Sequence, residues 1–259
     1  MTLRVWLFLI LGLISTSALG CEKPVKMLFG PFFSDAFVKQ LFSPIYGDIV
    51  QETGCPFEYR IAENMDAFSK LVLKQDFESV MIPSIHLEYF EQIGYQHLVS
   101  GFGPLDFVLL GSKKRGISKV SDLKGKDVLL NGDYTTLSVI WRGIEKKHDL
   151  VGKTNIAYHA HVDQLLMRLL RGQGDATITF RRFYNRIPEQ LKASLIELDS
   201  RTMKHPGTVV INEEVNERLA KQMKAAYIKR ESWFDRRPSQ DIRKDAYVHE
   251  RMRKTFGLY

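Results

Sequence analysis

Residues 117–145 read ISKVSDLKGKDVLLNGDYTTLSVIWRGIE, which predicts a strand, a polar turn and a helix in direct succession. Residues 128–130 are apolar and form the expected strand. Thr135, Thr136 and Ser138 follow, and hydroxyl side chains at such positions typically cap the start of a helix. The free N–H groups of a helix start, joined by hydroxyl donors, also favour the binding of a small oxyanion. The sequence alone is compatible with both interpretations, a helix cap and an anion-binding site.

Strand-like and helix-like runs alternate along the rest of the chain. Short apolar runs that indicate strands occur at residues 25–29, 57–61, 79–82, 107–110, 156–159, 176–180 and 208–211. Amphipathic runs that indicate helices occur at residues 34–54, interrupted by Pro44, and at 65–74, 86–93, 136–147, 162–171 and 213–228. This alternation is typical of an α/β protein.

The chain is long enough for two lobes, and we predict that each is a mainly parallel sheet flanked by helices. Lobe 1 would comprise residues 21–104 and 205–259, and lobe 2 residues 105–204. The chain would then cross between the lobes twice, near residues 101–107 and 202–208, and these crossings would act as a hinge.

The first twenty residues have the composition of a secretory signal peptide. Arg4 is followed by an apolar run at residues 5–14 and by small residues at 15–20. The apolar run is shorter than the roughly 20 residues that a helix needs to cross a bilayer. We expect cleavage before Cys21 and export of the mature chain. Lipidation of Cys21, as in a bacterial lipoprotein, is the alternative.

The two cysteines, Cys21 and Cys55, each precede a strand-like run. A strand, a helix and a parallel strand would set the two strand starts side by side. In an oxidising compartment the cysteines would form a disulfide, which typically stabilises a protein by about 2–4 kcal/mol. Two unrelated thiols are the alternative.

The mature chain would carry 36 Lys and Arg against 30 Asp and Glu, because cleavage removes Arg4 and no acidic residue. This surplus favours anionic ligands. The basic residues are spread along the chain without a nucleic-acid-binding motif, so we expect no nucleic acid as a partner. The basic clusters within residues 229–254 are mixed with acids, as on a solvated helix face.

Charged and imidazole side chains follow two of the expected strands in lobe 2. Arg181 and Arg182 come directly after residues 176–180, at the strand end where open α/β sheets bind ligands. A guanidinium there can hold an oxyanion through two hydrogen bonds, although a solvated pair is the alternative. His161 can donate to an oxyanion or carry a pH-dependent charge. His159 and His161 also have metal-ligand spacing, but no third ligand is evident and we predict no metal.

The order and spacing of several motifs resemble one family across most of the mature chain. They are Gly116-Ile-Ser118, Ser121-Asp-Leu-Lys-Gly-Lys-Asp-Val128, Thr135-Thr-Leu-Ser138, His161 with Gly172-Gln-Gly-Asp-Ala176, and Pro44, Tyr46 and Gly54. The family is that of the type II periplasmic substrate-binding proteins of phosphonate, phosphite and phosphate uptake. Two motifs depart from it. Ile82-Pro-Ser-Ile-His86 replaces a Gly-Pro turn with a downstream Tyr, and Met65-Asp66 replaces an Asp-Tyr pair.

The resemblance implies a two-lobed type II periplasmic-binding-protein fold that closes over a small oxyanion such as phosphate, a phosphonate or a related phosphorylated compound. It implies a periplasmic monomer that docks on a membrane ABC permease. Tyr46, Ser84 and His86 are the expected first-lobe ligand contacts. Since the departures fall among the first-lobe contacts, the organic part of the ligand is open.

Two other functions are weighed against solute binding for transport. A sensor would use the same fold to signal to a membrane receptor kinase. An exported enzyme on a related fold would need catalytic residues. The sequence has no Gly-x-Ser-x-Gly elbow, no phosphate-binding P-loop and no His-Glu-x-x-His helix, so we predict a non-enzyme without cofactors.

Overall fold

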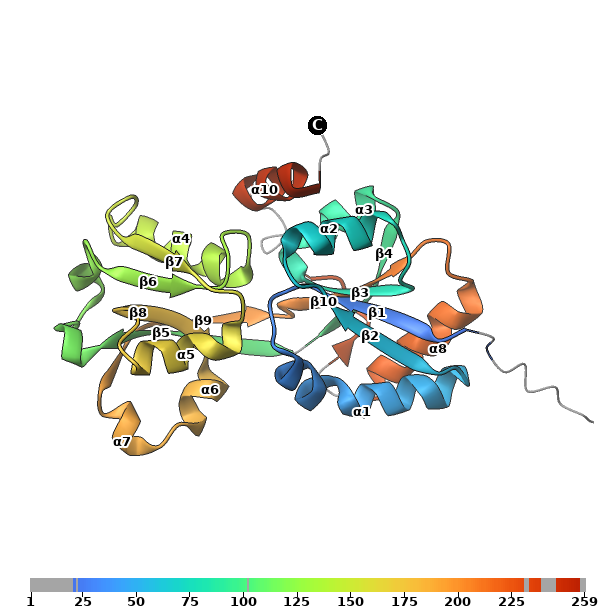
Figure 1. The fold of residues 1–259 in the computed structure, drawn as a ribbon, viewed down its shortest axis with the longest axis horizontal. Coiled ribbons are helices and arrows are strands. Elements are labelled where there is room, and N and C mark those ends of the chain that lie inside the picture. The colour runs from blue at the N-terminus through green and yellow to red at the C-terminus, as the bar shows by residue number, and fades with distance from the viewer. Residues whose placement is uncertain (1–20, 22, 102, 231–232, 239–245, 257–259) are drawn as a thin grey trace, which may run out of the picture.

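The computed structural model describes residues 21, 23–101, 103–230, 233–238 and 246–256. The signal peptide predicted for residues 1–20 lies outside the described residues, as does position 102 of the expected hinge. Two sheets, each flanked by helices, form two lobes side by side (Figure 1). The two-lobed α/β fold predicted from the sequence is confirmed. No helix in the described part of the chain is long and apolar enough to cross a membrane.

The first lobe contains a six-stranded sheet with the strand order β11-β4-β10-β3-β1-β2. Its strands are β1 (Val25–Phe29), β2 (Phe57–Ile61), β3 (Ser79–Pro83), β4 (Tyr95–Gly101), β10 (Gly207–Asn212) and β11 (Trp233–Phe234). Its helices are α1 (Asp35–Thr53), α2 (Met65–Leu73), the short 3-10 helix η1 (Ser84–His86), α3 (Leu87–Gln92), α8 (Glu217–Ile228) and α10 (Ala246–Phe256). Apolar side chains from both faces of this sheet are buried under the helices.

The second lobe contains a five-stranded sheet with the strand order β7-β6-β8-β5-β9. Its strands are β5 (Pro104–Ser112), β6 (Asp127–Leu130), β7 (Asn155–Tyr158), β8 (Ala176–Phe180) and β9 (Leu195–Lys204). Its helices are α4 (Thr136–Lys147), α5 (Val162–Leu170), α6 (Arg181–Arg186) and α7 (Glu189–Lys192), with 3-10 turns η2 (Lys113–Arg115) and η3 (Val120–Leu123). One apolar core, which includes the buried Trp141, holds this lobe together.

Both sheets are mixed, which corrects the expectation that each would be mainly parallel. Parallel pairs join β1 to β2 and β3, and β6 to β7 and β8. The strands next to the crossings, β4, β5, β9 and β10, run antiparallel to their neighbours, because the chain enters and leaves the second lobe in opposite directions. The two crossings are joined to each other, since His205 N donates to Gly103 O at 2.9 Å.

Helix α1 shows how local sequence sets an element's limits. It begins at Asp35, where the Ser34 hydroxyl accepts a hydrogen bond from Phe37 N. It ends at Thr53 and is capped by Gly54, whose φ of 69° favours glycine. Pro44 lies inside this helix and does not interrupt it, which corrects the sequence expectation. The helix continues because its side chains, Ile45 and Ile49 among them, pack into the core beneath it.

Cys21 and Cys55 form a disulfide, as the sequence predicted, with their Cα atoms 4.9 Å apart. The parallel register of β1 and β2 pairs Val25 with Phe57, and Val25 N donates to Pro56 O. This register brings the starts of the two strands together. The disulfide therefore ties the chain ahead of β1 to the edge strand β2.

Candidate ligand site between the two lobes

A cavity of about 60 Å³ lies between the lobes. It is lined by Phe32, Phe33, Phe37, Met81, Ile82, Pro83, Leu105, Phe107, Asn131, Thr135, Thr136, Leu137, Val162, Phe180, Arg182, Pro206 and Gly207. Several of these follow the carboxyl ends of the parallel strands β1, β6 and β8, the position where open α/β sheets bind ligands. A cavity needs about 10–15 Å³ to hold one water, so this cavity has room for a few heavy atoms.

The turn between β6 and α4 supplies most of the polar lining. Thr135 is the N-cap of α4 and is only 2% exposed. Its hydroxyl donates to Asn131 Oδ1 at 2.8 Å and accepts from Ser138 N at 3.4 Å. The Ser138 hydroxyl donates to Gly132 O. The hydroxyls of Thr135 and Ser138 are thus used within the turn, and Ser138 does not line the cavity.

Thr136 begins α4 and differs from its two hydroxyl-bearing neighbours. Thr136 lines the cavity, and its hydroxyl makes no hydrogen bond with any residue that the structure describes. The first N–H groups of a helix also lack partners within the helix. The start of α4, with its unpaired backbone donors and the Thr136 hydroxyl, therefore borders the cavity. Asn131 adds an amide, which the sequence does not predict as a site residue because Asn131 reads only as part of the turn.

The two adjacent arginines have different surroundings. Arg181 forms a bidentate ion pair with Glu197 on β9, with N–O distances of 2.9 and 2.5 Å, and does not line the cavity. Arg182 does line it. Its guanidinium carbon lies 5.3 Å from the ring centres of Phe37 and Phe180, and 5.4 Å from that of Phe183.

The Arg182 side chain has no carboxylate partner among the described residues, and its buried Nε has no hydrogen-bond partner there. Burial lowers the pKa of its guanidinium, and the Arg186 charge lowers it further. An arginine nevertheless stays protonated in a protein. Arg182 is therefore a half-buried cation at the wall of the cavity that an anion can neutralise.

The remaining predicted contacts do not line the cavity. His161 is the N-cap residue of α5, and its Nδ1 is buried without a hydrogen-bond partner among the described residues. Ser84 lies at the crossing, where its hydroxyl donates to His205 O at 2.6 Å and lies 2.7 Å from Thr208 Oγ1. Tyr46 belongs to α1 and stacks on the rings of Phe57 and Tyr59 on β2, and burial raises the pKa of its hydroxyl.

Several hydrogen bonds join the lobes around the cavity. His86 is fully buried and its Nε2 donates to Tyr134 O at 2.8 Å, from η1 to the β6–α4 turn. Ser34 donates to both carboxylate oxygens of Asp163, from its N at 3.2 Å and its hydroxyl at 2.7 Å. Val162 N donates to Phe32 O. The structure therefore represents a closed form of the two lobes.

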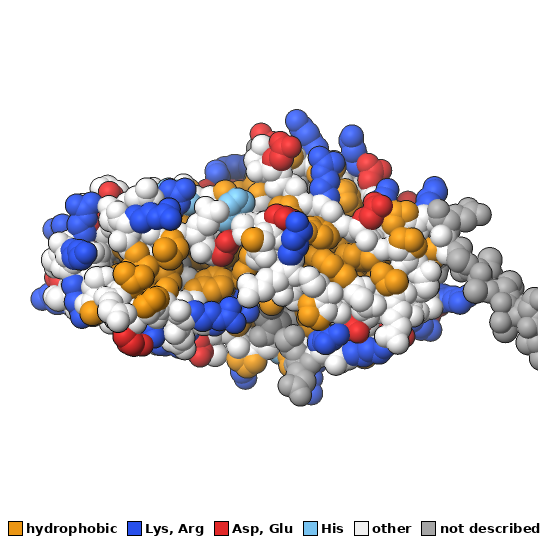
Figure 2. All heavy atoms as spheres, turned by 60° about the horizontal axis from the view of Figure 1, so that its bottom comes forward, with side chains coloured by type: hydrophobic (Ala, Val, Ile, Leu, Met, Phe, Trp, Pro, Cys, Tyr) orange, Lys and Arg blue, Asp and Glu red, His pale blue; other side chains and the backbone are white. Residues whose placement is uncertain are grey.

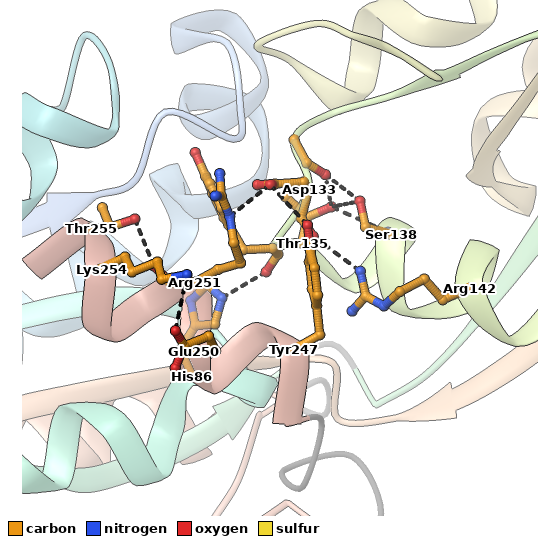
Figure 3. Close-up of polar contacts among 12 residues, drawn as sticks. His86, Asp133, Thr135, Ser138, Arg142, Tyr247, Glu250, Arg251, Lys254 and Thr255 are labelled. Atoms are coloured by element: carbon orange, nitrogen blue, oxygen red, sulfur yellow. Dashed lines mark hydrogen bonds and ion pairs between the residues drawn. The ribbon is translucent and has the colours of Figure 1, made fainter. Parts of the chain in front are cut away.

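Helix α10 adds a second connection between the lobes (Figure 3). It packs on α2, α3 and η1 of the first lobe. On its other side, Arg251 Nε lies 2.8 Å from Asp133 Oδ2 and the Tyr247 hydroxyl donates to the same oxygen at 3.3 Å. Arg142 of α4 lies over the Tyr247 ring at 4.5 Å and donates to Asp133 O. We call these four residues the α10 clamp.

The basic surplus is not concentrated at one place on the face shown in Figure 2. Figure 2 shows Lys and Arg side chains scattered over both lobes on the face in view, with hydrophobic side chains exposed between them. Many cations are paired on the surface, as in Lys39 with Asp35 and Lys221 with Glu217. In the described part of the chain no group of three or more His, Cys, Asp or Glu could hold a metal ion.

Two α/β lobes closed over a small cavity with a cationic wall define a solute-binding protein. The model of one family, described as the phosphonate periplasmic substrate-binding protein of ABC transporters, matches residues 27–248. The chain belongs to this family, which confirms the resemblance found in the sequence. No protein with a curated description matches the chain.

Solved structures share the fold at low sequence identity. PhnD1 of Prochlorococcus marinus in complex with methylphosphonate has a TM-score of 0.74 at 10% identity, covering 90% of this chain and 99% of that one. A binding protein component of an ABC phosphonate transporter from Pseudomonas aeruginosa has a TM-score of 0.65 at 12% identity, covering 82% and 76%. A Xanthomonas citri protein bound to ATP has a TM-score of 0.59 at 11% identity, covering 90% and 96%.

Proposed function

We propose that this chain captures a phosphonate or a closely related small oxyanion in the interlobe cavity and delivers it to an ABC permease. The observation that carries the proposal is Arg182, a half-buried cation without a carboxylate partner among the described residues, in the same cavity as the start of α4. Helix N-termini and guanidinium groups are the donors that proteins use for oxyanions. Family membership supports the same ligand class.

The proposed contacts within the cavity are Thr136, Asn131, Arg182 and the first N–H groups of α4. Thr135 and Ser138 would act indirectly, by holding the turn in the shape that aims these donors. The lobes would open and close about the crossings near residues 101–107 and 202–208, with lobe boundaries at 104/105 and 204/205. A ligand that binds the closed form more tightly than the open form shifts the population towards closure.

We further propose that the protein is an exported monomer and acts by binding alone, without catalysis. Residues 1–20 would be removed as a signal peptide on export to the periplasm. The disulfide uses the Cys21 thiol and so argues against a lipid anchor on that residue. Mass spectrometry of the purified mature protein would identify its first residue and any lipid attached to it.

Calorimetric titration with phosphate, phosphite and methylphosphonate tests the proposed binding. Arg182→Ala should weaken the binding of the anion by about 10- to 100-fold, because a hydrogen bond to a charged group contributes about 1.5–3 kcal/mol. Arg181→Ala is the matched control, since this neighbour is paired with Glu197 outside the cavity. Equal affinities for the two variants would contradict the proposed site.

A further inference from the structure

The cavity also restricts the organic group that a bound phosphonate can carry. Apart from Asn131, Thr135, Thr136 and Arg182, its described lining consists of aromatic, aliphatic, methionine, proline and glycine residues. None of these lining residues is Asp or Glu. A charged ligand group placed against the apolar wall would therefore find no counter-charge. Only the four polar residues could offer it a side-chain hydrogen bond.

The carboxylates next to lining residues in the sequence already have partners. Asp163, beside Val162, accepts two hydrogen bonds from Ser34. Asp106, between two lining residues of β5, accepts a hydrogen bond from Thr202 at 2.5 Å and is exposed. Neither carboxylate lines the cavity. An ammonium group in the cavity would lack a neutralising partner, and a buried unpaired charge is unfavourable.

Arg182 makes an ammonium group still less favourable. Its guanidinium is a cation at the same cavity wall, and it has no described carboxylate to offset its charge. The phosphonate head neutralises this cation, whereas an amine on the same ligand would be repelled by it. Like charges at close range disfavour each other most where water is excluded.

A second cavity of about 230 Å³ lies on the other side of Arg182 and Leu105 and is lined by apolar residues and two arginines. It shares Leu105 and Arg182 with the first, and its other lining residues are Leu41, Pro44, Ile45, Arg230 and Trp233. Arg230 is paired with Asp48, at 2.6 Å between Nε and Oδ2. No described residue lining this cavity is acidic either, so the space beyond Arg182 also offers no counter-ion for an amine.

We infer that the ligand is a phosphonate whose carbon substituent is uncharged and apolar, such as a short alkyl group, and that the site discriminates against aminoalkylphosphonates. This inference rests on the proposed function. The anion head would meet Arg182 and the start of α4, and the substituent would contact the apolar wall, which includes Phe33, Phe37 and Leu105.

Propylphosphonate and 2-aminoethylphosphonate provide a matched test. The two ligands have the same number of heavy atoms and differ at one end, which is a methyl group in the first and an ammonium group in the second. Calorimetric titration of the full mature protein at pH 7 should give an affinity for propylphosphonate at least 100-fold higher. Methylphosphonate and inorganic phosphate should be titrated alongside, since phosphate reports on the anion site alone and methylphosphonate adds the smallest alkyl group.

The outcomes separate the inference from the proposed function. If 2-aminoethylphosphonate binds as tightly as propylphosphonate or more tightly, the inference is wrong while the anion site stands. If none of phosphate, methylphosphonate and propylphosphonate binds, the proposed function is wrong and the inference falls with it. A third outcome is that methylphosphonate binds while propylphosphonate and 2-aminoethylphosphonate bind weakly and equally. This outcome would show that the site selects by size, and it would also overturn the inference.

Discussion

Arg181 and Arg182 are adjacent in the chain, yet one guanidinium is held by Glu197 and the other lies against three phenylalanine rings at the cavity. The sequence predicts an arginine at the end of β8 but cannot distinguish the two. The difference depends on α6, which starts at Arg181 and turns successive side chains in different directions. The partner on β9 is distant in sequence and is therefore not visible from local patterns.

The hydroxyl cluster shows a similar division of roles at the residue scale. Two of its three members, Thr135 and Ser138, are buried and bonded within the turn, and Thr136 lines the cavity. The capping interpretation of the sequence is confirmed at Thr135, and the binding interpretation stays a proposal, now for Thr136. A pattern of hydroxyls predicts that a helix starts here, but the side that each one faces depends on the folded turn.

Valine substitutions separate these two roles, because valine has the shape of threonine without its hydroxyl. Thr135→Val should lower the free energy of unfolding by about 1 kcal/mol through loss of the N-cap. Thr136→Val should leave the free energy of unfolding unchanged and weaken methylphosphonate binding several-fold. Chemical denaturation and calorimetric titration of both variants measure the two effects. Loss of stability in Thr136→Val with unaltered affinity would contradict the assignment.

At the scale of elements, most of the helices and buried strands follow from the sequence, because their apolar spacing and end signals are local. Strands β4, β11 and β9 are not predicted, and β9 shows one reason. Its sequence, residues 195–204, is rich in charged residues because it is the edge strand of its sheet and is largely exposed. Helix α8 starts at Glu217 rather than at the expected residue 213, because Asn216 caps it. Whether a strand lies at the edge of a sheet, and which residue caps a helix, depends on the assembled fold and not on local sequence alone.

The α10 clamp connects α10 to the turn between β6 and α4, which borders the proposed anion site. The substitution Asp133→Asn removes the negative charge that faces Arg251. It should weaken the contact between the two residues and so favour opening of the lobes. The ligand should then dissociate faster, by about 2- to 5-fold, because a partly exposed ion pair contributes about 0.2–1 kcal/mol. Stopped-flow dissociation of methylphosphonate measures this rate.

Lys254→Ala provides the control for the clamp. Lys254 lies on the same helix and pairs with Glu250 at 3.0 Å, without reaching the second lobe. Its removal should leave the dissociation rate unchanged. An Asp133→Asn rate no faster than that of Lys254→Ala would show that the clamp has no influence on closure.

At the scale of the whole molecule, the disulfide should stabilise the first lobe in particular. It closes a sequence separation of 34 residues, for which loop-closure entropy gives about 3–4 kcal/mol. Reduction should therefore lower the midpoint of chemical unfolding. The Cys21→Ser/Cys55→Ser double variant should unfold at the reduced midpoint and should not respond to reductant. An identical midpoint with and without reductant for the natural chain would contradict this expectation.

The order of strands has a further consequence for how the protein is made. β5 to β9 form one uninterrupted segment, whereas β10 comes after that segment and lies between β3 and β4. As the chain emerges in the periplasm from its N-terminal end, the second sheet can therefore assemble before the first. The first sheet must wait, with β3 and β4 unjoined, until β10 has emerged. During that interval the chain exposes open strand edges, which are prone to aggregate and which chaperones protect.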